Sequence, residues 1–251
     1  MKRILATLVF CLVGAASLSQ ARVSLRLVCD DTADLRVAIE CMLLLETRLP
    51  IDVEIVRMPW RRCLEVELRQ GLADGAFLAS YQAEREQYGA YPRLDGLLDS
   101  ERRYNNAGYF FYRRRNSAVS WDGRTVAGLN RAIGAPRGYS VVQDLRAAGY
   151  TVEESDNTLA DLRKLNAGRL DLVAAVEERA DQLLVDYPEL AASIEKVVIP
   201  YAVKPYFLML SHQFIARQPL LAEQIWDAVR SIRLTEYRSI FHRFMDEPAD
   251  E

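Results

Sequence analysis

The chain has 251 residues, of which 50% are hydrophobic and 27% are charged, and this balance is typical of a folded globular protein rather than a disordered or collagen-like one. Its formal net charge of -3 excludes the overall excess of Lys and Arg that points to a nucleic-acid partner. The length predicts one large domain or two small ones.

Residues 1–21 have the features of a secretory signal peptide. Lys2 and Arg3 precede an uncharged stretch over residues 4–16, and small residues stand at positions 19 and 21. The apolar stretch is shorter than the roughly 20 residues that a membrane-spanning helix needs. We therefore expect residues 1–21 to be cleaved and the mature chain to be exported.

Strands and helices are predicted to alternate along the mature chain. Short apolar runs indicate strands, and apolar residues at helical spacing indicate helices. The expected strands are 23–29, 51–56, 75–80, 107–112, 132–135, 151–153, 172–176 and 206–210. The expected helices are 34–47, 61–70, 141–148, 159–166, 179–186, 219–233 and 235–245. This alternation predicts an α/β fold of parallel βαβ units with helices on both faces of the sheet.

One pattern occurs twice. An amphipathic helix is followed by Gly71, two residues, Asp74 and an apolar strand, and the same order returns with Gly168 and Asp171. The glycine suits a left-handed helix end, and the aspartate can bond the backbone of the turn that leads into the strand. Helix, glycine and strand follow one another in many α/β proteins, so coincidence is the alternative. A true repeat predicts two similar lobes with a ligand cleft between them.

Several strings resemble a known family. They are Met-Pro-Trp-Arg-Arg-Cys-Leu at 58–64, Ala-Ser-Tyr-Gln-Ala-Glu-Arg at 79–85, Gly-Ala-Pro-Arg-Gly-Tyr-Ser at 134–140 and Leu-Asn-Ala-Gly-Arg-Leu-Asp at 165–171. In this order they resemble the bacterial extracellular solute-binding proteins of family 3, the polar amino-acid receptors of ABC importers. The resemblance implies a type II periplasmic binding protein fold. Lobe 1 would comprise residues 22–107 and 206–251, and lobe 2 residues 108–205, with a hinge of two chain crossings.

The resemblance also implies site residues in lobe 1. Arg85 stands where the family grips the α-carboxylate of its ligand, and a planar guanidinium suits that task. An ordinary surface arginine is the alternative. Ser80 and Tyr81 would add hydroxyl contacts, or would only pack and form the turn. Trp60 would wall the pocket, or would belong to the core.

Lobe 2 would face the same ligand with the start of the helix at 141–148. Gly138, Tyr139 and Ser140 precede this helix, so its free N–H groups and dipole would point at an anion. Ser140 would cap the helix, with or without a ligand contact, and capping alone is favoured. Arg137 would be a second anion clamp or would face solvent.

Two positions depart from the family pattern. The acidic residue that commonly holds the ligand ammonium falls near Val176, with Glu177 and Glu178 just beyond. The first strand is followed by Asp30 and Asp31 rather than by aromatic residues. Asp30 would bind a cation, or would belong to a run that caps the helix from residue 34 onward.

Export places Cys29, Cys41 and Cys63 in an oxidising compartment, where disulfides can form. Because three cysteines cannot all pair with one another, one thiol must stay unpaired. In the implied fold Cys29 and Cys63 both lie near the cleft edge of lobe 1. We expect a Cys29–Cys63 disulfide, with Cys41 buried and free. The cysteine spacing does not resemble a metal site, and we expect neither a metal nor a cofactor.

These inferences favour a periplasmic, monomeric, non-enzymatic receptor. It would capture a small carboxylate-bearing solute, an amino acid or a related compound, by lobe closure, and would deliver it to a membrane ABC permease. One alternative is a dehydratase-like enzyme on the same fold, with Glu177, Glu178 or Asp30 as its acid or base. The other is a sensor that acts in trans on a membrane signalling partner.

Overall fold

A computed structural model describes residues 22–31 and 35–246. The predicted signal peptide and the start of the first helix at residue 34 lie outside these residues. Among the described helices, none is both long enough and apolar enough to cross a bilayer.

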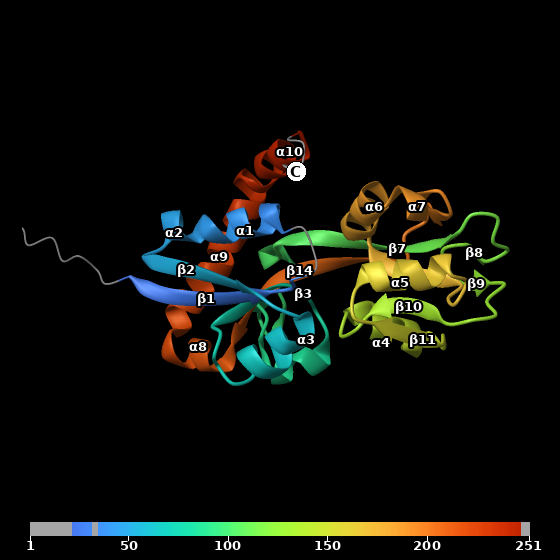
Figure 1. Ribbon diagram of the computed structural model, residues 1–251. Coiled ribbons are helices and arrows are strands. Elements are labelled where there is room, and N and C mark those ends of the chain that lie inside the picture. The colour runs from blue at the N-terminus through green and yellow to red at the C-terminus, as the bar shows by residue number, and fades with distance from the viewer. Residues whose placement is uncertain (1–21, 32–34, 247–251) are drawn as a thin grey trace, which may run out of the picture.

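Lobe 1 is built on three parallel strands. β1 (Val23–Cys29) pairs with β2 (Ile51–Arg57) and with β3 (Gly75–Ser80). One face carries α1 (Arg36–Leu43), α2 (Leu45–Arg48), α9 (Pro219–Thr235) and α10 (Tyr237–Asp246), and the other carries α3 (Trp60–Arg62) and the π-helix η1 (Cys63–Leu68) (Figure 1). The helix α8 (His212–Arg217) packs its Phe214 into the core that contains α1 and α9.

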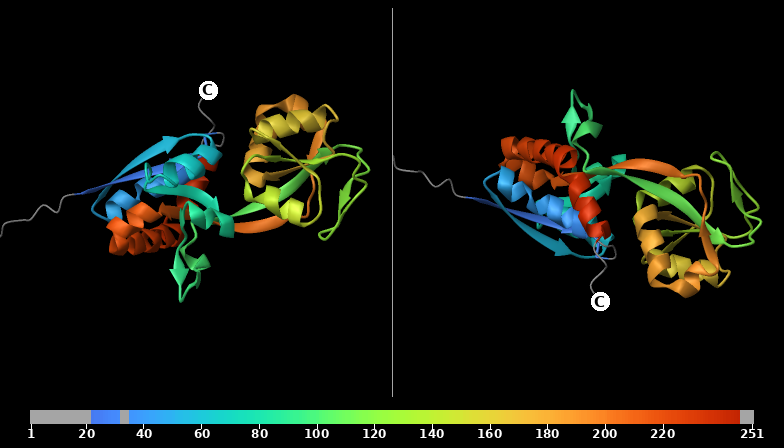
Figure 2. Two further views of the ribbon diagram at one scale, coloured as in Figure 1. Left: turned by 90° about the horizontal axis from the view of Figure 1, so that it is seen from below. Right: turned by 90° about the horizontal axis from the view of Figure 1, so that it is seen from above.

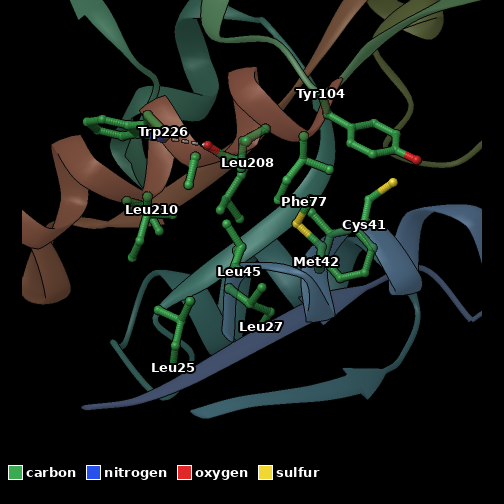
Figure 3. Close-up of a cluster of buried hydrophobic side chains, with 14 of the residues drawn as sticks. Leu25, Leu27, Cys41, Met42, Leu45, Phe77, Tyr104, Leu208, Leu210 and Trp226 are labelled. Atoms are coloured by element: carbon green, nitrogen blue, oxygen red, sulfur yellow. Dashed lines mark hydrogen bonds between the residues drawn. The ribbon is translucent and has the colours of Figure 1, made fainter. Parts of the chain in front are cut away.

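Each face of this sheet has its own apolar core. Leu25, Leu27 and Phe77 pack toward α1 and α9, where the indole of Trp226 donates to the Leu208 carbonyl at 2.9 Å (Figure 3). Val28 points the opposite way, into a cluster formed with η1. Period-two alternation along β1 therefore fills two separate cores.

Lobe 2 repeats the plan with β10 (Ile133–Pro136), β11 (Val152–Ser155) and β12 (Leu172–Val176), again all parallel. The core with α4 (Ser140–Ala147) lies on one face. The core with α5 (Thr158–Asn166), α6 (Glu177–Asp186) and α7 (Pro188–Ala191) lies on the other.

Two ten-residue strands run from one lobe into the other. β7 (Asn105–Arg114) and β14 (Ala202–Ser211) pair antiparallel, with β7 also bonded to β12 and β14 to β3. The strand order is β11-β10-β12-β7-β14-β3-β1-β2. Figure 2 shows the two lobes joined along these strands. The predicted α/β fold is confirmed, and the three strands at the centre of each lobe are parallel as expected. The sheet as a whole is mixed, because β7 is antiparallel to β12 and β14, and β14 is antiparallel to β3.

The remaining elements are short and were not predicted. They are β4 (Gly89–Ala90), β5 (Arg93–Leu94), β6 (Leu97–Leu98), β8 (Ser120–Trp121), β9 (Val126–Ala127), β13 (Ile194–Lys196), and the 3-10 turns η2 (Ala83–Gln87) and η3 (Ser100–Arg102). Pieces of two to five residues carry too few apolar positions to show a period.

The repeated pattern has the same structure in both lobes. Gly71 and Gly168 both have left-handed backbones, with φ of 68° and 72°. Asp74 accepts from the main chain of Arg26 in β1 at 2.9 Å, and Asp171 accepts from the N–H groups of Asn130 and Arg131, just before β10, at 2.7 Å each. Each aspartate thus ties its turn to the neighbouring strand rather than to the turn itself.

The expected Cys29–Cys63 disulfide is not formed. Cys29, Cys41 and Cys63 are buried free thiols in the described chain. Cys29 lies in the core with α1 and α9, whereas Cys63 lies in the core on the opposite face, where its thiol donates to the Met58 carbonyl at 3.5 Å. The two side chains therefore point away from each other across the sheet.

Candidate ligand-binding site

A cavity of about 590 Å³ lies between the lobes. This volume falls within the roughly 300–1,000 Å³ of sites that enclose small organic ligands. Its walls come from β3, β7 and β14, from the starts of α1, α4 and α6, and from one face of α10. The lining includes Asp30, Trp60, Phe77, Ser80, Arg85, Tyr109, Tyr139, Ser140, Val176, Glu178, Tyr206, Tyr237 and Phe241.

Arg85 lies in the wall of this cavity with only 7% of its surface exposed. The turn η2 follows β3 and folds the side chain back, so that Nη1 donates to the Ser80 carbonyl at 2.7 Å and to Ser80 Oγ at 3.1 Å. Nη2 donates to the Gly138 carbonyl of lobe 2 at 2.8 Å, and the guanidinium carbon lies 5.5 Å from the centre of the Trp60 ring.

All these partners of Arg85 are neutral. Among residues 22–31 and 35–246, no carboxylate forms an ion pair with this guanidinium. A buried cation normally has an anionic partner, because its desolvation is otherwise uncompensated. Arg85 is therefore the side chain in this cavity that is best placed to bind an anion.

Two buried serines join the lobes beside Arg85. Ser80 Oγ donates to Ser140 Oγ at 2.8 Å, and each serine is 2% exposed. The predicted capping role of Ser140 is wrong, because the N-cap position belongs to Tyr139 and no side chain in the described structure caps α4. The Ser140 hydroxyl faces the cleft instead.

A lysine from β14 contacts Ser140 from behind as part of an ion pair. Lys204 donates to Ser140 Oγ at 2.9 Å and forms an ion pair with Asp144, one turn further along α4. Burial lowers the pKa of Lys204, against the opposing effect of Asp144. From lobe 1, the amide of Gln82 donates to Asp144 at 3.2 Å and to the Ser140 carbonyl at 3.1 Å.

Tyrosines complete the inner end of the cavity. The hydroxyl of Tyr139 donates to Asp30 at 2.7 Å across the cleft. The hydroxyls of Tyr109 and Tyr206 lie 2.8 Å apart on the two crossing strands, and burial raises the pKa of both. Asp30 is thus a hydrogen-bond acceptor at the cleft edge.

Two predicted residues are not brought into the cavity. Tyr81 is partly buried and packs edge-on against Tyr91, with ring centres 5.2 Å apart, at the side of a core of lobe 1. Arg137 is exposed and pairs with Asp156 at 3.1 Å, so the solvent-facing alternative describes it.

The place expected for an ammonium site is apolar at its centre. Val176 lines the cavity at the end of β12. Glu177 turns to Lys196, whose amine donates to it at 2.7 Å. Glu178 also lines the cavity; the residue is exposed, yet desolvation of its carboxyl by the surrounding protein raises its pKa.

Sequence reasoning missed Lys204, Asp144 and Gln82. A weak signal existed for two of them. Lys204 is the one charged residue of β14, and Asp144 follows Ser140 at the i, i+4 spacing of a shared helix face.

Comparison with known proteins supports the fold. No family model and no curated protein matches the sequence. An ancestral arginine-binding protein bound to arginine superposes with a TM-score of 0.71 at 17% identity, over 89% of this chain and 99% of that one. A histidine kinase sensor domain with similarity to periplasmic binding proteins gives 0.69 at 15%, over 91% and 99%. An ancestral amino-acid-binding protein, a precursor of cyclohexadienyl dehydratase, gives 0.66 at 14%, over 88% and 94%.

These similarities show a type II periplasmic binding protein fold, as the resemblance to solute-binding proteins of family 3 predicted. The matched proteins include binders, a sensor domain and a precursor of an enzyme. Fold alone therefore does not choose among these activities.

Proposed function

We propose that the protein is a periplasmic solute receptor that closes its lobes around a small carboxylate-bearing solute, an amino acid or a related compound, and delivers it to an ABC permease. The observation that carries this proposal is the buried Arg85 in the cavity wall, which has only neutral partners in the described chain.

The remaining donors of Arg85 suit a carboxylate. The hydrogen bonds of Nη1 to Ser80 and of Nη2 to the Gly138 carbonyl use only part of the five N–H donors of the guanidinium. The first N–H groups of α4 and the positive end of its dipole lie beside Ser140. Together with Arg85 they favour an anion at this end of the cavity.

Closure follows from where the site residues lie. Arg85, Ser80 and Trp60 belong to lobe 1, whereas Tyr139 and Ser140 belong to lobe 2. A solute that contacts both sets stabilises the closed arrangement over an open one. β7 and β14 would serve as the hinge, because they are the strands that pass between the lobes.

The test is thermal unfolding of the mature chain with a panel of amino acids, organic acids and amines. A ligand at about 100 times its Kd stabilises the native state by roughly 2.7 kcal/mol. We expect an upward shift of Tm with carboxylates, lost in Arg85→Gln and kept in Arg137→Gln. The proposal fails if no carboxylate shifts Tm, or if Arg85→Gln leaves the shift unchanged.

An enzyme is the second candidate, because Glu178 lines the cavity and its raised pKa suits a general acid. NMR spectra of a carboxylate incubated with the protein for hours would distinguish an enzyme from a receptor. Conversion of the carboxylate that is lost in Glu178→Gln would support the enzyme, and an unchanged carboxylate would support the receptor.

A further inference from the structure

The cavity extends well beyond the anion site. Its outer half is formed by α10 of lobe 1 and α6 of lobe 2, and it continues from Arg85 without interruption. At about 590 Å³ the whole cavity lies in the range that encloses drug-sized molecules, which are larger than a single amino acid.

One face of α10 lines the outer half with aromatic rings. Tyr237, Phe241 and Phe244 follow one another at i, i+4 and i+7, so they share a helix face, and all three line the cavity half-buried. Tyr237 is fixed by Tyr104, with ring centres 5.4 Å apart, and by Asn105, which donates to its hydroxyl at 3.1 Å. This rigid apolar wall favours an apolar or aromatic group.

The helix α10, which carries this aromatic face, is held against lobe 1 by polar contacts at its two ends. Arg48 pairs with Glu236 just before the helix, and Arg243 pairs with Glu40 of α1. The face of α10 that bears His242 is exposed. The aromatic face is therefore presented to the cavity by anchored backbone rather than by a loose end.

The wall beside the anion site repels an ammonium group. Val176 pairs in register with Tyr109, whose ring lies 5.7 Å from the Lys204 amine. Most carboxylates near this wall are already engaged: Asp30 accepts from Tyr139, and Glu177 and Asp181 both pair with Lys196. Glu178 follows Val176 with a pKa raised chiefly by desolvation. An ammonium next to the bound carboxylate would therefore meet the apolar Val176 side chain and the Arg85 guanidinium.

We propose that the ligand is a carboxylate without an adjacent ammonium, attached to an extended apolar or aromatic body that lies against Tyr237 and Phe241. Arg85 binds its carboxylate, and the α10 face binds its body. This inference rests on the proposed receptor function, and it narrows the ligand from amino acids to amphiphilic organic acids.

The test is calorimetric titration of the mature chain with matched compounds. L-Phenylalanine and 3-phenylpropionate differ only in the ammonium, and 5-phenylpentanoate adds two methylenes to the body. We expect 3-phenylpropionate to bind at least about tenfold more tightly than L-phenylalanine, and 5-phenylpentanoate about tenfold more tightly again. Val176→Asp supplies a carboxylate that can accept hydrogen bonds from the ammonium. It should therefore reduce or reverse the preference for 3-phenylpropionate over L-phenylalanine.

Variants of α10 test whether the outer half of the cavity binds the apolar body of the ligand. Phe241→Ala should weaken 5-phenylpentanoate by about tenfold while leaving the affinity for acetate within about twofold. His242→Ala, on the exposed face of the same helix, should change neither affinity and serves as the matched control. Circular dichroism of each variant confirms that α10 is retained.

The outcomes separate the two proposals. If polar amino acids bind through Arg85 more tightly than the phenylalkanoates, or if Phe241→Ala leaves 5-phenylpentanoate binding unchanged, the ligand inference is wrong and the receptor function stands. If no carboxylate of either kind binds, both are wrong.

Discussion

The hydroxyl of Ser80 at the end of β3 donates to the hydroxyl of Ser140 at the start of α4, at 2.8 Å, although 60 residues separate them. Each serine belongs to a different lobe, and both are almost fully buried. The inner end of the cleft is therefore closed by direct hydrogen bonds between lobes, and the bond from Arg85 to the Gly138 carbonyl adds another.

The ion pair behind Ser140 should contribute measurably to stability. The side chains of Lys204 and Asp144 are 15% and 32% exposed, so Asp144→Asn leaves a largely buried ammonium without its counter-ion. Discounting for partial exposure, we expect a loss of about 1–3 kcal/mol in the free energy of unfolding, measured by urea denaturation.

A surface pair provides the control for this loss. Arg137 and Asp156 are 50% and 83% exposed, and Asp156→Asn should change the free energy of unfolding by no more than about 0.5 kcal/mol. Equal effects of the two substitutions would show that the Lys204–Asp144 pair is as strongly screened as a surface pair.

Trp60 should report ligand binding by fluorescence. Its ring lines the cavity under the Arg85 guanidinium, whereas Trp226 lies in the core of lobe 1 and Trp121 packs near Tyr201 in lobe 2. A bound ligand that displaces water from Trp60 should shift its emission. We expect the change to vanish in Trp60→Phe and to persist in Trp121→Phe. A change that survives Trp60→Phe would place the ligand elsewhere.

Local pattern predicted the scaffold well. The structure gives β1, β3 and β12 the predicted limits, because β1 alternates apolar and polar residues while β3 and β12 are apolar runs bounded by turn residues. Gly71 and Gly168 end their helices in the left-handed conformation that the sequence indicated. These features depend on neighbours within a few residues, which a single sequence displays.

Contacts between distant segments were harder to predict. Lys204 meets Ser140 across 64 positions, and this contact exists only because β14 passes between the lobes. The Ser140 hydroxyl then bonds Ser80 and Lys204 rather than capping α4. The Cys29–Cys63 error was avoidable, since Cys29 shares a strand face with Leu27 while the helix that carries Cys63 covers the other face.

The mature protein should contain three alkylatable thiols. Burial raises the pKa of Cys29 and of Cys41 to about 12, and also raises that of Cys63, so all should react slowly in the native state. In denaturant without reductant, mass spectrometry should count three alkyl groups on the exported protein. A count that reaches three only after reduction would show that a disulfide forms.

Asp161 should make stability fall as pH rises. This carboxyl in α5 is fully buried against Gly134 of β10, and neither oxygen has a hydrogen bond of good geometry in the described chain, although the Ser155 hydroxyl lies nearby. Burial raises its pKa from 3.8 to about 7. The folded state therefore keeps a proton that the unfolded state has released.

The sign of the pH effect follows from this difference. Below about pH 4 both states hold the proton, and between about pH 4 and 7 only the folded state does, so the contribution of Asp161 to the free energy of unfolding decreases with rising pH. Asp161→Asn keeps the shape of the side chain but removes its charge. The free energy of unfolding of this variant should exceed that of the wild type by about 1–3 kcal/mol at pH 8 and should be close to it at pH 4. Urea denaturation at both pH values measures this. A variant that is destabilised equally at both would show that Asp161 serves as a hydrogen-bonding group rather than as a buried acid.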